Sequence, residues 1–234
     1  MARRRTLEAM RDQARALADM TNTNFVTNAE ANVLLNQAIA ELWSMLTTTA
    51  PQRYMTSSVV TMVAGTREYS LPDDFMALLG VDWVVGNDRY PLEPFSLNER
   101  GVGPYAGITS LDPCTPGCRY DIRYGGLDGS GARLVFDRDP PAGSVQVLYV
   151  QAPQLLEADD DEFDGIAGWE DWAVLDVAIK MLAKEESDPS VYVAQQARLE
   201  QRIQGLAPKR DIGRTRQLPR YSESRGRGRT MRLR

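Results

Sequence analysis

The sequence contains no histidine among its 234 residues. Histidine is the commonest general base and the usual partner of a nucleophilic serine or cysteine, so its absence excludes those catalytic centres. The two cysteines, Cys114 and Cys118, cannot complete a structural zinc site by themselves. A small disulfide-closed loop and two reduced thiols both fit them, and ordinary cysteine usage favours reduced thiols. We expect no metal and no other cofactor.

The sequence also lacks an apolar run of the roughly 20 residues that a membrane-spanning helix needs. Its first residues, Met-Ala-Arg-Arg-Arg, precede an amphipathic stretch and not an apolar signal core, so we expect neither secretion by that route nor a membrane partner. Hydrophobic residues make up 43% of the chain, which is enough for a folded core.

Charge is divided unevenly along the chain, whose net charge is -5. From Lys209 onward ten basic residues face two acidic ones, a charge of +8, which leaves -13 on residues 1–208. Such a division is typical of a tail that binds something the body does not.

The tail is rich in arginine separated by glycine and serine, so we expect it to stay extended until it binds. Its candidate binding residues are Arg210, Arg214, Arg216, Arg220, Tyr221, Arg225, Arg227, Arg229, Arg232 and Arg234. Arginines in such a segment suit nucleic-acid phosphates or an acidic groove on a protein. A tail that only keeps the protein soluble is the third interpretation, and composition does not choose between DNA and protein.

Helical periodicity marks the first fifty residues. Apolar residues at spacings of three and four predict a helix over 6–21. Thr27 and Glu30 form a capping box before a second helix, whose apolar spacing continues through 35–46 until Pro51 stops it.

Two more helices are predicted near the end. The first starts at Gly168 and ends near Ser187. The second has Asp188 as its N-cap and Pro189 in its first turn, and it runs to Gly205.

Between these pairs, short runs rich in β-branched and aromatic residues, separated by turn signals, predict a β-rich region over about 56–152. The segment YGGLDGSG lacks the spacing of a phosphate-binding loop and predicts a hairpin turn. The separation of helices from strands indicates an α+β fold and not a parallel doubly wound sheet. We expect a helical-bundle body (1–55 and 165–207), an inserted β-rich domain (56–155), an acidic loop (156–164) and an extended basic C-terminal arm (208–234).

Three other features could carry function. The acidic run, with Glu157, Asp159, Asp160, Asp161, Glu162 and Asp164, lacks the ligand pattern of a calcium loop, and a solvated loop before a helix is the favoured interpretation. The carboxylate pairs Asp73–Asp74 and Glu170–Asp171 could serve hydrolysis, but adjacent residues point in different directions and a catalytic role is not expected. Trp43, Trp169 and Trp172 fit either core packing or an oligomer interface.

The order of the segments resembles one family. REYSLPDDF is followed by LLGVDW and RYPLEPFSLNERG, then by LVFDRDPPAGSVQVLYVQAP and the tryptophan-rich DGIAGWEDWAVLDVAIKMLAKEESDP. This order is similar to that of the head-to-tail adaptor (head completion, connector) proteins of tailed bacteriophages and gene transfer agents. The resemblance covers roughly residues 6–207.

The resemblance implies a structural virion protein without an active site, assembled in the host cytoplasm and located at the head–tail interface. It implies a ring, commonly of twelve copies, that binds beneath the portal protein and surrounds a channel for duplex DNA. The C-terminal arm would dock on the portal, and the β-rich region would meet a tail component such as a nozzle or terminator protein. An acidic body would let DNA pass without sticking. A nucleic-acid-binding protein and a carboxylate-based cell-wall hydrolase remain the alternatives.

Overall fold

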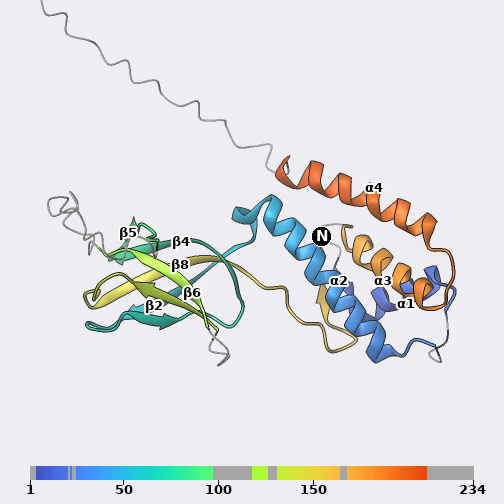
Figure 1. The fold of residues 1–234 in the computed structure, drawn as a ribbon, viewed down its shortest axis with the longest axis horizontal. Coiled ribbons are helices and arrows are strands. Elements are labelled where there is room, and N and C mark those ends of the chain that lie inside the picture. The colour runs from blue at the N-terminus through green and yellow to red at the C-terminus, as the bar shows by residue number, and fades with distance from the viewer. Residues whose placement is uncertain are drawn as a thin grey trace, which may run out of the picture.

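The computed structural model describes residues 4–20, 22, 25–96, 118–125, 131–163 and 168–209. These residues form a mixed α and β fold with four α-helices and antiparallel sheets, as Figure 1 shows. The arginines and Tyr221 of the predicted arm lie outside the described residues, as do Asp164 and Cys114. No helix in the described part of the chain combines the length and apolar character that crossing a membrane requires.

The two N-terminal helices begin at threonine caps. Helix α1 (Leu7–Leu17) starts where the Thr6 hydroxyl accepts a hydrogen bond from the backbone N–H of Ala9. It ends earlier than the sequence predicted, because Asp19 takes a left-handed conformation with φ of 55°.

Helix α2 (Asn28–Thr49) starts at the predicted cap, with the Thr27 hydroxyl accepting from the N–H of Glu30. The Glu30 carboxylate accepts two hydrogen bonds from Lys184, so it is used for tertiary contact instead of the return bond of a capping box. Pro51 ends the helix as predicted and begins the short 3-10 turn η1 (Pro51–Tyr54).

The two C-terminal helices follow the predicted plan. Helix α3 (Glu170–Lys184) lies between its neighbours and buries most of its side chains. Helix α4 (Ser190–Leu206) begins one residue later than predicted, with Pro189 and not Asp188 in the capping position, although the Asp188 carboxylate accepts the N–H of Ser190. The chain then makes a 3-10 turn, η3 (Ala207–Lys209).

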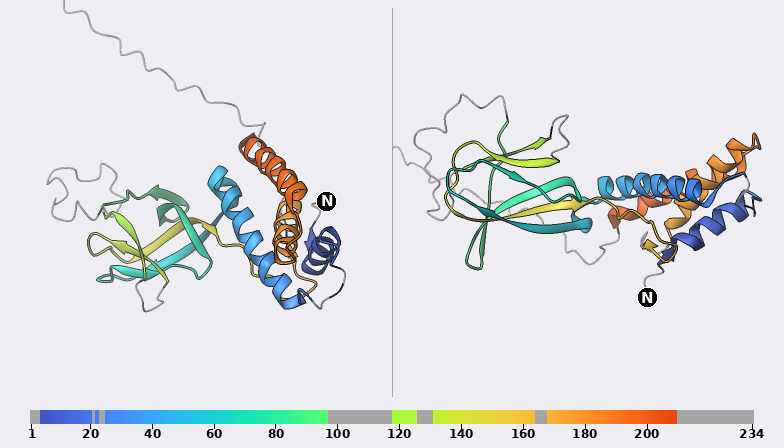
Figure 2. Two further views of the ribbon diagram at one scale, coloured as in Figure 1. Left: turned by 45° about the vertical axis from the view of Figure 1, so that its right-hand side comes forward. Right: turned by 90° about the horizontal axis from the view of Figure 1, so that it is seen from below.

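The four helices share one apolar core. Its largest fully buried side chains include Leu7, Met10, Leu35, Ile39, Leu42, Leu46, Met181 and Ile203. Figures 1 and 2 show α3 between α4 and α1, and helix α2 packs against all three of the others.

Two antiparallel sheets form the β-rich part. The larger contains β2 (Met55–Met62), β8 (Gly143–Gln151), β4 (Phe75–Val85) and β5 (Asp88–Pro91), in that order. The smaller contains β3 (Glu68–Ser70), β7 (Ala132–Phe136) and β6 (Tyr120–Tyr124). Strands β6 and β7 pair with Tyr124 opposite Ala132, so the predicted hairpin is present, although its turn residues 126–130 lie outside the described residues.

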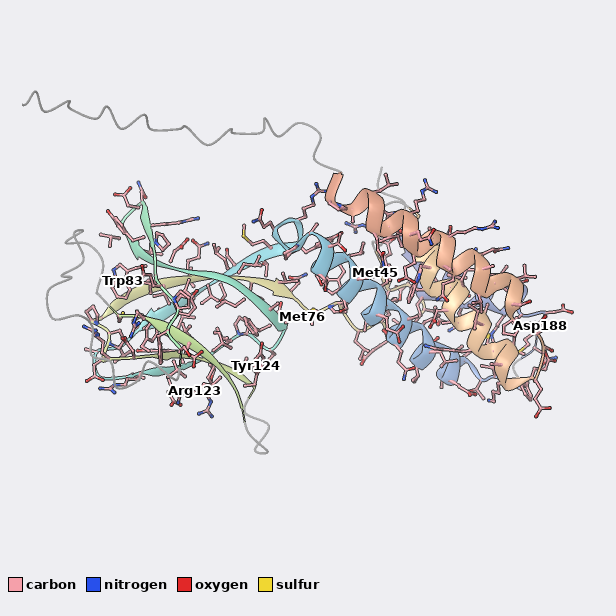
Figure 3. All side chains as sticks on the ribbon, turned by 45° about the horizontal axis from the view of Figure 1, so that its top comes forward. Met45, Met76, Trp83, Arg123, Tyr124 and Asp188 are labelled. Carbon is pink, nitrogen blue, oxygen red and sulfur yellow. The ribbon has the colours of Figure 1, made fainter. Side chains whose placement is uncertain are left out.

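The sheets enclose a second core, which includes Val81, Trp83, Leu134, Phe136, Val145, Val147 and Tyr149. Figure 3 shows Trp83 in this β-rich part and Asp188 at the opposite end of the molecule. The two parts meet at Trp43, whose Nε1 donates to the carbonyl of Gln151 (2.8 Å) and whose ring packs edge-on against Tyr54.

Candidate assembly surfaces

Helix α1 presents only acidic charge to solvent. Both of its arginines turn inward, since Arg11 is 4% exposed and Arg15 is 5% exposed. Arg15 donates to the carbonyls of Asn22 and Val26 and to the side-chain oxygen of Asn28, and these hydrogen bonds hold its guanidinium inside the protein. The exposed charged residues of the helix are Glu8 and Asp12, four positions apart and therefore on one face.

The acidic run continues this surface because it is fastened to α1. The backbone N–H groups of Leu7 and Glu8 donate to the carbonyls of Asp161 and Asp159. Arg11 donates to the Asp159 carboxylate at 2.7 Å, and this hydrogen bond lowers the pKa of Asp159. The run therefore holds the first helix in place.

The other acidic candidates divide into bound and exposed residues. The Asp161 carboxylate accepts the N–H groups of Glu157 and Ala158, and these backbone bonds lower the pKa of Asp161.

Glu162 lies in β9 (Glu162–Phe163), which pairs with β1 (Arg5–Thr6), and its carboxylate contacts Arg4. The side chains of Glu157 and Asp160 are exposed.

We use the term acidic face for the exposed acidic residues of α1 and its adjoining loops, leaving out Asp159, which is paired with Arg11. Its members are Glu8, Asp12, Asp19, Glu157 and Asp160. A surface of this kind repels nucleic-acid phosphates and attracts basic protein surfaces.

Helix α4 has the opposite character. It packs inward through Tyr192, Leu199 and Ile203. We use the term α4 face for the exposed residues on its opposite side, Val191, Ala194, Arg198, Arg202 and Gly205. Val191 is 63% exposed, and the two arginines, four positions apart, are the only charged residues among these five. Figure 1 shows α4 on the outside of the helical part.

Arg53 holds the last described residues of the chain, at the start of the predicted arm. Its guanidinium donates to the carbonyl of Ala207 at 2.7 Å and to that of Pro208 at 3.0 Å. Since Arg53 lies in η1, just before β2, the arm starts beside the junction of the helical and β-rich parts.

Strand β2 is an edge strand that lacks the usual protection. Natural edge strands carry charges or proline that hinder pairing with another chain. β2 has neither in its eight residues, and Val59 on its outward side is 64% exposed. At the other edge of this sheet, β5 carries Asp88, Arg89 and Pro91.

The candidate tryptophans occupy interior positions in this chain. Trp169 and Trp172 are buried in the helical core. Trp43 is partly buried at the junction with β8. The two buried indoles leave little surface for a neighbouring copy.

The two carboxylates of each adjacent pair have different surroundings. Asp74 accepts a hydrogen bond from the Tyr149 hydroxyl, whereas exposed Asp73 lies at a cavity of about 590 Å³ next to Pro72 and Tyr124. Figure 3 shows Tyr124 at the edge of the β-rich part.

Both carboxylates of the second pair, Glu170 and Asp171, contact other groups of the protein. Glu170 is 1% exposed and accepts the N–H of Gly168, while Asp171 lies 2.7 Å from Arg5. The described residues contain no cluster of three side chains suited to hold a metal ion.

Cys118 is a buried free thiol. Burial is the main cause that raises its pKa to about 11, so little reactive thiolate forms near neutral pH. Cys114 lies outside the described residues.

Sequence reasoning missed three of these features: the acidic surface of α1, the α4 face and the unprotected edge of β2. Their signals were present in the charge spacing of Glu8–Asp12 and Arg198–Arg202 and in the uncharged run SSVVTM. Their exposure, however, depends on how the elements pack.

Comparison with known proteins gives one clear match. A family model described as SU10 adaptor protein matches residues 5–228. The match therefore extends beyond Ala207, where the resemblance noted from the sequence stopped, and into the basic arm. No curated protein matches the chain.

Proposed function

The chain belongs to the SU10 adaptor protein family, and from this premise we propose that it is a structural virion protein that joins the portal of a tailed bacteriophage to its tail. It assembles as a ring, of twelve copies where it follows the twelvefold portal, and extends the DNA channel below the capsid. The observation that carries this proposal is the family match over nearly the whole chain.

The charge distribution supports a channel protein. The body carries -13 over residues 1–208. A body of this net charge repels duplex DNA and lowers non-specific binding, which suits a passage for a moving polyanion.

The basic arm is proposed to dock on an acidic surface of the portal protein. Arginine in an extended segment binds carboxylates with two hydrogen bonds at once. Arg53 supports this role, because it fixes the direction in which the chain leaves α4.

The β-rich part is proposed to meet the tail component, a nozzle or terminator protein. Its unprotected β2 edge supports this assignment, since such an edge can accept a strand from a partner through backbone hydrogen bonds.

Mass measurement tests the proposal directly. The purified chain, the portal protein of the same phage and their mixture would be compared by native mass spectrometry. We expect a complex in which one portal ring carries a full ring of adaptor copies. Separate portal and adaptor in the mixture would refute the proposal.

A truncation tests the arm. A chain that ends at Pro208 should remain folded, as judged by circular dichroism, and should lose affinity for the portal. Undiminished portal affinity of the truncated chain would show that docking does not depend on the arm.

A second candidate function is nucleic-acid binding by the arm, favoured by its charge of +8. It predicts duplex-DNA affinity whose logarithm falls with log salt by about 0.9 for each phosphate neutralised. Absence of binding at about 50 mM salt would eliminate it. We assign no catalytic activity, and we expect Asp73 and Glu170 variants to match the unaltered chain in showing none on peptidoglycan.

A further inference from the structure

We propose that neighbouring copies of this chain contact each other through the acidic face of one copy and the α4 face of the next. This inference rests on the proposed ring and identifies the residues that would hold it together. The contact joins Glu8 and Asp12 to Arg198 and Arg202 of the adjacent copy.

The two faces are complementary in charge and spacing. Glu8 and Asp12 are one helical turn apart on α1, and Arg198 and Arg202 are one turn apart on α4. Side chains at this spacing lie about 6 Å apart, so two helices placed side by side can form two carboxylate–guanidinium pairs. The inward burial of Arg11 and Arg15 leaves Glu8 and Asp12 as the exposed charged residues of α1 itself.

Small exposed residues beside the charges permit close approach. Ala9 and Ala16 are exposed on α1, while Ala194 and Gly205 are exposed on α4. Small residues let helix axes come within about 8 Å, the lower end of the usual range. Val191, exposed on the α4 face, would gain apolar contact in such an interface.

The placement of the helices suits a ring. Both α1 and α4 pack on α3, and they touch at their ends, where the Tyr192 hydroxyl donates to the carbonyl of Leu17. Figure 2 shows them on different sides of α3. Contact between two different surfaces repeats from copy to copy and gives a ring when the rotation between neighbours closes, whereas a symmetric pairing would place like charges together.

A different occupant of the acidic face is conceivable, namely the basic arm (210–234) of a neighbouring copy. The α4 face is favoured because Arg198 and Arg202 lie at the same one-turn spacing as Glu8 and Asp12. The experiment below separates the two occupants.

Charge reversal tests the contact in the full-length chain. Arg198→Glu with Arg202→Glu would be compared with Glu8→Arg with Asp12→Arg, and ring formation on the purified portal would be followed by native mass spectrometry. We expect each double variant to raise the concentration required for ring formation about tenfold or more, because like charges then meet at every contact. Arg89→Glu, on the exposed surface of β5, serves as a control that should assemble normally.

Rescue makes the test specific. A chain carrying all four substitutions restores opposite charges at every contact and should form rings again. An equal mixture of the two double variants should also form rings, with the two kinds of copy alternating. Loss of assembly from misfolding would not be rescued in either way.

The outcomes separate the hypotheses. Normal rings from Arg198→Glu with Arg202→Glu would overturn this inference and leave the proposed function intact. If Glu8→Arg with Asp12→Arg fails to form rings while Arg198→Glu with Arg202→Glu forms them normally, the acidic face has another occupant, such as the arm, and the inference is wrong. Failure of the unaltered chain to form any ring on the portal would refute the proposed function itself.

Discussion

The guanidinium of Arg11 lies 2.7 Å from the carboxylate of Asp159, a residue 148 positions later in the chain. The side chain of Arg11 is 5% exposed, whereas that of Asp159 is 58% exposed. This ion pair, together with two backbone hydrogen bonds from Leu7 and Glu8, attaches the first helix to the acidic run. The run is therefore a structural fastening as well as part of the acidic face.

We expect this fastening to weaken in acid. The folded protein lowers the pKa of Asp159 below its ordinary value of 3.8, chiefly through the Arg11 hydrogen bond. The resulting stabilisation is present above the ordinary pKa and is lost as pH falls through the lowered one. Asp159→Asn should reduce the urea midpoint at pH 7, and its difference from the unaltered chain should shrink near pH 3.

The neighbouring Asp160 provides the control for this measurement. Its side chain is exposed, so Asp160→Asn should leave the midpoint nearly unchanged at both pH values. Equal behaviour of Asp159→Asn and Asp160→Asn would show that the Arg11 contact does not stabilise the fold.

Packing in the sheet core predicts that alanine substitutions at Gly143 and at Gly80 will change the free energy of unfolding by very different amounts. A Cβ atom on Gly143 would lie 2.5 Å from Cζ2 of Trp83, whereas one on Gly80 would lie 4.0 Å from Cδ1 of Leu148. Gly143→Ala must displace a buried indole, and we expect a loss of about 1–3 kcal/mol in the free energy of unfolding. Gly80→Ala should change it by about 1 kcal/mol at most, in the stabilising direction. Urea unfolding monitored by tryptophan fluorescence measures both, and similar losses would contradict the packing described here.

The buried thiol of Cys118 predicts slow chemical modification. In a Cys114→Ser variant, a thiol reagent at pH 8 should react with the folded chain about a hundredfold more slowly than with the urea-unfolded chain. The factor follows from a rise in pKa from 9.0 to about 11, which reduces the thiolate fraction accordingly. The rate in the folded chain should rise steeply as pH approaches 11. Equal rates for folded and unfolded chains would mean that Cys118 is accessible.

Local sequence signals predicted the elements well. The Thr27 cap and Pro51 gave the limits of α2, and the glycine-rich segment after Tyr124 indicated the β6–β7 hairpin. These features depend on residues close together in the chain, where backbone preferences decide the structure.

Long-range pairings were not predictable in the same way. Strand β2 pairs with β8, which lies about 90 residues away, and nothing in either strand specifies that partner. Glu30 fitted a capping box but pairs with Lys184, because a cation from α3 is a stronger partner than a backbone N–H. Likewise, the inward orientation of Arg11 and Arg15 depends on acceptors supplied by other segments.

Arg53 links the fold to the proposed docking of the arm. Its two hydrogen bonds, to the carbonyls of Ala207 and Pro208, hold η3, which follows α4, against η1, which precedes β2. Arg53→Ala should reduce the free energy of unfolding by about 1–3 kcal/mol, because the part-buried Ala207 carbonyl loses its donor. Once residues 207–208 are no longer held by Arg53, binding to the portal must also order these residues. This ordering costs entropy, so portal affinity should fall about threefold to tenfold.

The matched variant for this position is Arg53→Lys. A lysine keeps the positive charge but cannot reach both carbonyls with the fixed fork of a guanidinium, so its portal affinity should be intermediate. Isothermal titration of each chain against the portal would measure the three affinities. Equal affinities of Arg53→Ala and the unaltered chain would show that the position of the arm's first residues is irrelevant to docking. Arg53→Lys binding as well as arginine would mean that charge, and not the held exit point, is what the portal requires.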